Sequence, residues 1–421
     1  MIEIQTRELL LLAWQQAIAA VAPAAALAAH WPRPPAAPAC LKVLAIGKAG
    51  AAMAQAAVAH YGTDLRGLVL VPDGHRLGIE LPSGFRVLES AHPLPDARSL
   101  QSAEAALNLV RGLGESDLLL VLLSGGGSSV MAKPRAGITL ADKQELTRQL
   151  QERGASIVEL NCLRSQLSAI KGGRLAAACD APVVTLAISD VPGNDAALIA
   201  SGPTLRSRTT PAEAAAVLQR FDITANPAVA ALLARAPDPA PLPRAADRFT
   251  VVASGMTMLA AVQALLESRA YRVVNLGDAI GGDARTLARD HAAQIVRLAG
   301  QGPAIALLSG GETTVSLKHA GGRGGRNSEY LLQLALALDG KPDVWALAAD
   351  SDGIDGYGGH AGALLAPDSL TRARSLGLDA TAYLERNDSA AFFDALGDVL
   401  MTGPTQTNVN DLRLLLFAAG A

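Results

Sequence analysis

Aromatic and charged residues are scarce in this chain. Among its 421 residues only 3% are aromatic and 18% are charged, and the formal net charge is −3. Few aromatic rings leave little material for the base-stacking surfaces that bind single-stranded nucleic acids. A slightly negative chain also lacks the basic footprint of a nucleic-acid-binding protein. We therefore expect no nucleic-acid partner.

Cysteines and long apolar runs are scarce as well. The three cysteines have neither metal-site nor disulfide-framework spacing, which is typical of thiols in a reducing compartment. The start, Met1–Glu8, is too acidic for a signal peptide. The apolar stretch after it is broken by Gln15-Gln16 and Pro23, which favours a buried helix over a membrane span. These features predict a cytoplasmic protein without a membrane partner.

Apolar residues, by contrast, make up half of the chain, and alanine and glycine dominate it. Short apolar runs alternate with helical or turn-rich stretches, a pattern typical of a parallel sheet with helices on both faces. The strands expected in the first half are residues 41–46, 68–71, 86–88, 118–123 and 182–188. The fold class predicted for this half is a Rossmann-like α/β domain.

A proline-rich segment between Arg235 and Asp247 is the best linker candidate. It predicts an N-terminal domain at residues 1–238 and a second α/β domain at residues 247–421, with the active site in the cleft between them. The strands expected in the second domain are residues 249–253, 271–276, 304–308, 344–348 and 398–402.

A Ser-Gly-Gly motif occurs twice, each time after an apolar run. Leu122–Val130 aligns without a gap on Leu307–Val315. A strand that ends in Ser-Gly-Gly is expected to turn sharply and to present N–H groups to an anion. The first copy is bare backbone, whereas Glu312 of the second adds a carboxylate for a metal. Capping of the next helix by Ser128 is a compatible alternative.

Two further turns follow predicted strands. Lys48, between Gly47 and Gly50, is suited to bind a phosphate, although a tight turn with a solvated lysine explains it equally well. Asp190 follows the strand at 182–188, at the edge where open α/β sheets bind ligands. There it is suited to accept a proton or to hold Mg²⁺, with a turn-capping role as the alternative.

Two basic segments are candidate anion-binding sites. Arg164, Lys171 and Arg174 are spaced seven and three residues apart, which predicts one cationic helix face or end; a solvated helix face is the alternative. Arg326 lies in the glycine-rich loop 321–329, which favours recognition of a phosphate or carboxylate over a merely flexible loop.

An acidic segment and a small polar segment complete the candidates. Asp350, Asp352 and Asp355 follow an apolar run at a spacing that suits a hard divalent cation, with a solvated acidic turn as the alternative. Residues 402–410 are small and polar, and an ordinary turn explains them as well as a ligand contact does.

Taken together, these motifs resemble, in order, those of the class II glycerate kinases, which have an N-terminal glycerate-kinase domain and a C-terminal MOFRL domain. The motifs that carry the resemblance are Gly47-Lys48-Ala49-Gly50, His92-Pro93-Leu94-Pro95-Asp96, Ser124-Gly125-Gly126-Gly127-Ser128, Ser189-Asp190-Val191-Pro192-Gly193, Ser309-Gly310-Gly311-Glu312-Thr313, Gly324-Gly325-Arg326-Asn327, Asp352-Gly353-Ile354-Asp355-Gly356 and Thr402-Gly403-Pro404-Thr405.

The resemblance implies ATP- and Mg²⁺-dependent phosphorylation of D-glycerate, usually at the 2-hydroxyl, with Lys48 and Arg326 as the functional pair. Two positions depart from the family pattern: Ser328 stands where glutamine is common, and residues 357–362 lack an aspartate that usually follows Gly356. Some family members carry the name hydroxypyruvate reductase, which the lack of a dinucleotide-binding fingerprint in this chain does not support.

Motifs and resemblance together lead to a full set of expected roles. The expected catalytic residues are Lys48, Arg326 and Asp190. The expected substrate- or phosphate-binding residues are Ser124, Gly125, Gly126, Gly127, Ser128, Arg164, Lys171 and Asn327. The expected nucleotide-binding residues are Gly310, Gly311, Thr313 and Thr405, and the expected metal ligands are Glu312, Asp350 and Asp352.

The expected cofactors are ATP and Mg²⁺, and the expected substrate is D-glycerate. A homodimer is compatible with the sequence. Two alternatives from other classes remain, a hydroxypyruvate reductase that uses NAD(P)H and a non-catalytic sugar-acid- or nucleotide-binding protein.

Overall fold

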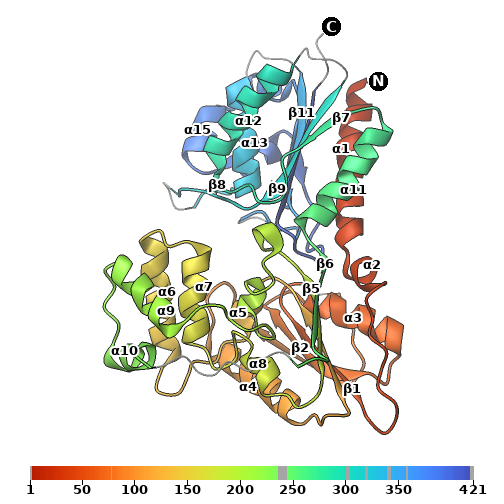
Figure 1. Ribbon diagram of the computed structural model, residues 1–421. Coiled ribbons are helices and arrows are strands. Elements are labelled where there is room, and N and C mark those ends of the chain that lie inside the picture. Colours follow the sequence, from red (N-terminus) through yellow and green to blue (C-terminus); the bar gives the residue numbers. More distant parts are fainter. Residues whose placement is uncertain are drawn as a thin grey trace. The chain divides into compact units, whose positions relative to one another are not determined.

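The computed structural model describes residues 2–76, 78–235, 244–299, 304–317, 321–338, 343–356 and 359–417. The chain forms two compact units (Figure 1). The N-terminal unit is Ala26–Val252, and the C-terminal unit combines Ala253–Ala421 with Met1–Ala25. Most of the proline-rich segment proposed as a linker lies outside the described residues.

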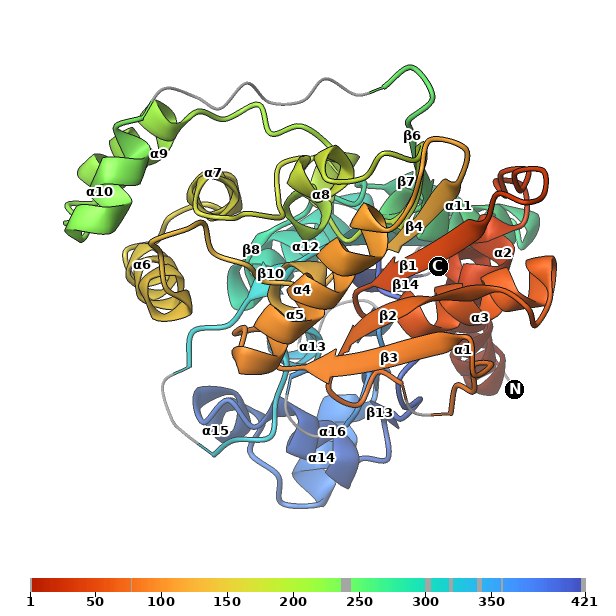
Figure 2. The same cartoon turned by 90° about the horizontal axis from the view of Figure 1, so that it is seen from below.

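The N-terminal unit is built on a six-stranded sheet in the order β3-β2-β1-β4-β5-β6. Neighbouring strands from β3 to β5 pair in parallel, and Figure 2 shows β3, β2, β1 and β4 side by side. The strands are β1 (Leu41–Ile46), β2 (Arg66–Pro72), β3 (Phe85–Ser90), β4 (Leu118–Leu123), β5 (Val183–Ile188) and β6 (Arg248–Ala253). The predicted Rossmann-like sheet is thereby confirmed.

Both faces of this sheet are buried. Leu44 and Ile46 of β1 belong to one core with residues of α4, while the alternate residues Val43 and Ala45 are equally inaccessible on the other face. This double burial explains why the strands are almost continuously apolar. The helices next to the sheet are α3 (Gly50–Tyr61), α4 (Ala97–Arg111), α5 (Gly127–Val130) and α8 (Arg174–Ala177), and two 3₁₀ turns, η1 (Pro192–Asn194) and η2 (Ile199–Ser201), follow β5.

A group of four helices in the same unit has a small core of its own, which includes Leu146, Leu163 and Leu218. The helices are α6 (Leu140–Glu152), α7 (Ile157–Gln166), α9 (Pro211–Arg220) and α10 (Pro227–Leu233). Each of the first three begins with a capping box, in which the hydroxyl of a Ser or Thr and a carboxylate three residues later satisfy each other's backbone N–H groups.

The C-terminal unit contains a mixed sheet in the order β13-β12-β11-β14-β9-β7. Among its described strands, β7 and β9 pair in parallel and the other neighbours pair antiparallel. The strands are β7 (Arg272–Asn275), β9 (Ile305–Gly311), β11 (Val344–Asp350), β12 (Gly362–Leu365), β13 (Val399–Leu400) and β14 (Asp411–Phe417). The short strands β8 (Gly282–Asp283) and β10 (Thr313–Thr314) pair separately. A second α/β fold is confirmed.

Helices cover this sheet and complete a core that includes Leu307, Tyr330 and Phe392. They are α11 (Gly255–Ser268), α12 (Ala284–Leu298), α13 (Arg326–Leu338), α14 (Ser369–Ser375), α15 (Ala380–Glu385) and α16 (Ser389–Ala395). Helix α13 begins at Arg326, so the glycine-rich loop leads directly into it.

Two parts of the chain belong to other units than the sequence indicates. Helix α1 (Ile2–Val21) lies along α11 in the C-terminal unit, with α2 (Pro23–Leu27) following it (Figure 1). The Arg7 guanidinium donates to Asp398 at 2.6 Å, and the Thr407 hydroxyl donates to the Val21 carbonyl at 2.8 Å. Conversely, β6 completes the first sheet. The two compact units therefore differ from the division at 1–238 and 247–421: residues 1–25 belong to the C-terminal unit, and the N-terminal unit extends to Val252. Helix α1 is apolar and is buried against α11, far away in the sequence.

The apolar character of α1 is explained by this packing. Leu10, Ala13 and Ala17 of α1 have no accessible surface. Across the described parts of the chain, no helix combines the length and the apolar character of a membrane-spanning segment.

Candidate functional site

The topological switch point of the N-terminal sheet lies between β1 and β4. The chain runs from β1 outward to β2 and β3, then returns to place β4 and β5 on the other side of β1. Open parallel sheets bind ligands outside the carboxyl ends of strands at such a point. The two loops found there are Gly47–Gly50 and Ser124–Gly127, both predicted as ligand loops. The sheet therefore brings them together.

Hydrogen bonds join these two loops directly. The backbone N–H of Lys48 donates to the Gly125 carbonyl at 2.8 Å, and the N–H of Ala49 donates to Ser124 Oγ at 3.0 Å. Gly47 has φ +105°, and a Cβ there would lie 2.4 Å from the Ser124 carbonyl oxygen. Only glycine permits this approach.

The Lys48 side chain lies against Gly126. Gly126 has φ +80°, and a Cβ on it would lie 3.2 Å from Lys48 Cγ and 3.4 Å from His92 Cε1. The imidazole of His92 is held by a 2.7 Å hydrogen bond between its Nδ1 and Ser129 Oγ. His92 begins the motif His92–Asp96, for which the sequence alone predicts no role. Its position directly after β3 on the carboxyl edge was the available signal.

Ser128, in the same loop, is the centre of a second network. The Lys171 ammonium donates to both the carbonyl and the hydroxyl of Ser128. The hydroxyls of Ser128 and Ser201 lie 2.9 Å apart, and Ser201 donates to Asn161 Oδ1 at 2.9 Å. Two predicted anion-binding residues, Ser128 and Lys171, are thus in direct contact.

The expected row of three cations is divided by the fold. Arg174 donates to the carbonyls of Ser165 at 2.9 Å and Lys171 at 3.0 Å, so its guanidinium caps the end of α7 and the following turn. Arg164 instead lies near Lys171: after burial and Lys143, its positive charge is among the causes that lower the pKa of the Lys171 ammonium well below its ordinary value.

Asp190 has the position that the sequence indicates. It follows Ser189 at the carboxyl end of β5, the strand next to β4. The Ser189 hydroxyl accepts a 3.2 Å hydrogen bond from the N–H of Val191, which turns the chain there. Asp190 is therefore one strand away from the Ser124 loop, on the same edge of the sheet.

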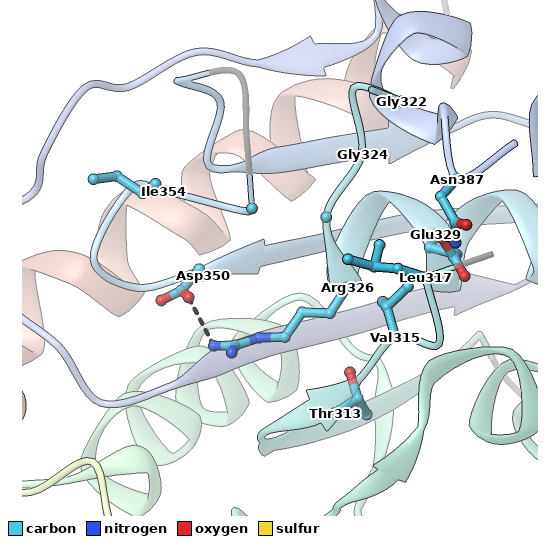
Figure 3. A pocket seen from close by; sticks show the side chains of 12 residues that line it. Thr313, Val315, Leu317, Gly322, Gly324, Arg326, Glu329, Asp350, Ile354 and Asn387 are labelled. Carbon is cyan, nitrogen blue, oxygen red and sulfur yellow. Dashed lines mark hydrogen bonds and ion pairs between the residues drawn. The ribbon is translucent and has the colours of Figure 1, made fainter. Parts of the chain in front are cut away.

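In the C-terminal unit, Arg326 is surrounded by carboxylates. Its Nε donates to Asp411 at 2.9 Å and one Nη donates to Glu312 at 2.6 Å. The other Nη donates to Asp350 at 2.7 Å, the contact drawn in Figure 3. Burial alone would lower the pKa of the Arg326 guanidinium, but these carboxylates raise it above its usual value. Arg326 is permanently charged, and its charge is compensated.

Asp411 holds this network together, and the sequence interpretation missed it. Its carboxylate has no accessible surface and accepts from Arg326, from Asn327 Nδ2 at 2.8 Å and from Arg413 Nη2 at 2.6 Å. No strand was predicted at 411–417, although two charged residues two positions apart in an apolar run mark a buried pair. β14 lies between β9 and β11 and is central to the sheet.

Asp355, expected near a divalent cation, instead caps helix α13. Its two carboxylate oxygens accept the N–H groups of Asn327 at 3.0 Å and Ser328 at 2.9 Å. A Cβ on Gly325 would lie 2.2 Å from Asp355 Cγ, which explains the glycine before Arg326. In the structure the Asp355 carboxylate therefore fixes the start of α13, the helix that begins with Arg326.

The two departures from the family pattern lie beside this cap. The Ser328 hydroxyl bonds to the N–H and the carbonyl of Gly325 at 3.0 and 3.1 Å and accepts from Ser389 at 3.0 Å, so a short side chain fits there. The imidazole of His360 is buried, with its Nε2 3.5 Å from Asp355 Oδ2. Tyr357 and Gly358 lie outside the described residues.

The second Ser-Gly-Gly copy does not form a turn, contrary to expectation. Strand β9 continues through Gly311, where it still pairs with β14. Gly311 has φ +105°, and a Cβ there would lie 2.2 Å from the Ile280 carbonyl oxygen. The carbonyls of Gly310 and Gly311 accept from Arg413 at 3.2 and 3.4 Å. Both glycines thus serve close packing inside the sheet.

The C-terminal unit contains a pocket of about 270 Å³ (Figure 3). One part of its wall is apolar, with Val315, Leu317 and Ile354, and another is polar, with Arg326 and Asp350. The remaining lining residues are Thr313, Gly322, Gly324, Gly325, Glu329, Gly356 and Asn387. The pocket brings together three predicted site residues, Thr313, Arg326 and Asp350.

The expected metal ligands have other partners. Glu312 and Asp350 pair with Arg326, and Asp350 also accepts the N–H of Asp352 at 3.1 Å. Asp352 Oδ1 accepts the N–H of Ile354 at 2.8 Å, while Thr405 donates its N–H to the Asp352 carbonyl at 3.0 Å. In the described ranges, no three acidic, histidine or cysteine side chains gather as a metal site would require. As arranged, Glu312 and Asp350 are counterions of Arg326.

Comparisons with known proteins agree with this architecture. Residues 9–234 match the model described as "Domain of unknown function (DUF4147)", and residues 305–411 match the MOFRL family. A protein of Agrobacterium vitis named "Putative hydroxypyruvate reductase" is 43% identical over 98% of this chain and 95% of its own. The D-glycerate 2-kinase of Thermotoga maritima is 34% identical over 88% of this chain and 89% of its own.

A solved structure has the same fold over the whole length. The crystal structure of a glycerate kinase from Thermotoga maritima matches with a TM-score of 0.86 and 33% identity, covering 98% of this chain and 100% of the other. The switch-point loops, the parallel and mixed sheets and these matches agree: the chain belongs to the glycerate kinase family, with a DUF4147 region followed by a MOFRL region.

Proposed function

We propose that the protein transfers the γ-phosphoryl group of ATP to the 2-hydroxyl of D-glycerate, giving 2-phospho-D-glycerate and ADP. The observation that carries the proposal is the pairing of the Lys48 loop with the Ser124–Gly127 loop at the switch point of the N-terminal sheet. Membership in the glycerate kinase family supports the choice of substrate and reaction.

Lys48 is the residue proposed to act on the transferred group. Phosphoryl transfer needs positive charge near the equatorial oxygens and accurate positioning more than it needs covalent chemistry. The ammonium of Lys48 extends from a loop that Gly125 and Ser124 hold by two hydrogen bonds. A charge on such a preorganised loop stabilises the transition state without further rearrangement.

Asp190 is proposed to accept the proton of the attacking 2-hydroxyl. Its carboxylate follows β5 on the edge that also carries the Ser124 loop, one strand away. A carboxylate in hydrogen-bonding reach of the acceptor hydroxyl orients that hydroxyl and takes its proton as the new O–P bond forms. The expected effect of Asp190→Asn is therefore a loss of turnover with little change in ATP binding.

Arg326 is proposed to act with the nucleotide-binding residues Thr313 and Thr405. The pocket in front of Arg326 offers an apolar wall and backbone groups of four glycines, which suit part of a nucleotide. Nucleotide roles for Gly310 and Gly311 would be indirect, because both glycines are packed inside the sheet.

Mg²⁺ dependence is proposed together with ATP. Carboxylates are the right donors for this ion, which usually binds through one or two of them and through substrate phosphates. Because Glu312 and Asp350 already neutralise Arg326, a role for them or for Asp352 as ligands requires an exchange of partners. The roles proposed for Lys48 and Asp190 do not depend on which residues hold Mg²⁺.

Hydroxypyruvate reduction is the second candidate, favoured by the name of the relative from Agrobacterium vitis. A reductase of this kind uses NAD(P)H, whose pyrophosphate usually lies on a Gly-x-Gly-x-x-Gly turn after the first strand. The turn after β1 has Lys48 and Ala49 between Gly47 and Gly50, and so does not have this pattern.

One experiment separates these activities. Purified protein is incubated with ATP, Mg²⁺ and a panel of small hydroxy acids while ADP release is measured, and phosphorus NMR identifies the product. We expect ADP release with D-glycerate and the 2-phosphate as product. Prompt NADH oxidation with hydroxypyruvate in the absence of ADP release would overturn the kinase proposal, and ligand binding without either reaction would indicate a non-catalytic protein.

A further inference from the structure

Three cationic side chains converge inside the N-terminal unit. Lys143 comes from α6, Arg164 from α7 and Lys171 from the turn after α7, and the positive charges of Lys143 and Arg164 both act on Lys171. Helices α6 and α7 lie side by side (Figures 1 and 2). We call these three residues the cation cluster. Lys143 is 6% exposed and Lys171 is 2% exposed, values that lysine reaches rarely without an anionic partner.

No carboxylate balances the cation cluster. In the described part of the chain none of the three side chains forms an ion pair, and burial and the neighbouring cations, with no carboxylate among them, act on their pKa values. The Lys171 ammonium donates to the neutral Ser128. Burial, and after it the charge of Arg164, lowers the pKa of Lys143 to about 8. Buried charges without counterions are destabilising, so this positive potential calls for an anion from outside the chain.

The C-terminal unit presents the opposite situation. Arg326 has three carboxylate partners at 2.6 to 2.9 Å, and Arg413 pairs with Asp411 at 2.6 Å. A substrate carboxylate brought to Arg326 would meet Asp350, Asp411 and Glu312, and like charges at contact distance repel. An acid is therefore better accommodated at the cation cluster than at Arg326.

The cluster also adjoins the proposed catalytic loop. Lys171 bonds to Ser128, while Lys48 lies against Gly126, two residues earlier in the same loop. A three-carbon acid held here by its carboxylate would lie along the loop that carries Lys48.

We propose that Lys143, Arg164 and Lys171 bind the carboxylate of the acceptor acid, with Lys143 as a binding residue that no motif of the sequence reveals. The inference rests on the proposed function, since it names the part of the protein that selects an acid over a neutral polyol. In this proposal the substrate carboxylate is recognised by the cation cluster of the N-terminal unit and not by Arg326 of the C-terminal unit.

The test replaces Lys143 by methionine. Lys143→Met removes an uncompensated buried charge while keeping an apolar side chain of similar length, so the melting temperature should stay the same or rise. We expect the KM for D-glycerate to rise by about tenfold or more, as for a lost hydrogen bond to a charged group, while the KM for ATP stays within about twofold. Lys143→Arg should restore part of the affinity, and Arg164→Met should have the same effect as Lys143→Met.

Lys133→Met is the matched control. Lys133 is part-exposed, pairs with Glu104 and lies outside the cluster, so its loss should leave the KM for D-glycerate unchanged. An unchanged KM for D-glycerate in Lys143→Met would overturn the inference. An equal rise in the KM for ATP would also overturn it, because the cluster would then serve the nucleotide phosphates.

Isothermal titration calorimetry tests the carboxylate site separately from the proposed reaction. D-glycerate, glycerol and inorganic phosphate are titrated separately into the wild-type protein and into Lys143→Met. We expect D-glycerate to bind the wild type, glycerol not to bind, and the variant to lose about tenfold or more in affinity. If no hydroxy acid is phosphorylated but this binding difference is present, the proposed function fails and the inference stands. Tight binding of phosphate without D-glycerate, or equal binding of D-glycerate to both proteins, would refute it.

Discussion

Replacing Asp411 by asparagine tests whether a single buried carboxylate holds the Arg326 site together. The Asp411 carboxylate has no accessible surface and accepts from Arg326, Asn327 and Arg413 at 2.9, 2.8 and 2.6 Å. Asp411→Asn preserves the size of the side chain. It removes the negative charge and turns one acceptor into an N–H donor, which then faces guanidinium donors.

The expected loss of folding stability depends on which carboxylate partners Arg326 and Arg413 keep in Asp411→Asn. Arg326 keeps Asp350 and Glu312, whereas Asp411 is the carboxylate with which Arg413, itself without accessible surface, forms its ion pair in the described structure. Leaving a buried charge without its partner costs about 3 to 5 kcal/mol. For a folding unit of this size the corresponding fall in melting temperature is roughly 6 to 20 °C.

Differential scanning calorimetry and urea denaturation measure this effect. Asp394→Asn is the matched control, because Asp394 pairs with Arg323 at 3.2 Å and both side chains are about half exposed. An exposed pair of this kind contributes about 0 to 1 kcal/mol, so the control should melt close to the wild type. If Asp411→Asn melts with the control, Asp411 does not compensate the buried arginines, and the account of the network is wrong.

Three further predictions concern the catalytic loop and pH. Lys48→Met should reduce turnover by on the order of 10²- to 10³-fold while the circular dichroism spectrum is unchanged; more than a tenth of wild-type turnover would contradict its role. Gly126→Ala should lower kcat more than Gly137→Ala. Both glycines have φ near +80°, but of these two only the Cβ at Gly126 would contact Lys48 and His92. Equal effects on kcat would mean that Gly126 is needed only for its backbone conformation. Burial lowers the pKa of His291 to about 4, so below pH 6.5 the unfolded chain binds a proton that the folded chain does not. Urea denaturation should therefore show stability falling by about 3 kcal/mol between pH 7 and pH 4, and His291→Gln should remove this part of the slope.

The two Ser-Gly-Gly copies show how identical sequences acquire different structures. After β4 the paired register ends at Leu123, and the chain turns and enters α5 at Gly127. After Leu308 the chain finds β14 alongside and stays extended through Gly311. The two copies thus differ in backbone: one is a loop, and the other is a strand that ends at Gly311, directly before Glu312, whose carboxylate pairs with Arg326.

The sequence by itself determined the fold class, the family and the loop positions in the N-terminal unit. Continuous apolar strands, such as residues 118–123, occur only where both faces of a sheet are buried, and their carboxyl ends locate the loops. The places of Lys48, the Ser124 loop and Asp190 were predicted in this way, because each follows a strand and the prediction needs no knowledge of distant residues.

The tertiary structure alone decided which side chains meet. Asp411 and Arg413 lie some 85 residues beyond Arg326, and only the pairing of β14 between β9 and β11 brings them to it. Likewise, the sequence around Lys143 does not distinguish this lysine from the exposed polar residues of α6. Its burial beside Lys171 depends on how α6 packs on α7. Periodicity reports which face of an element is buried, but charge compensation is a property of contacts between elements, so it appears only once the chain is folded.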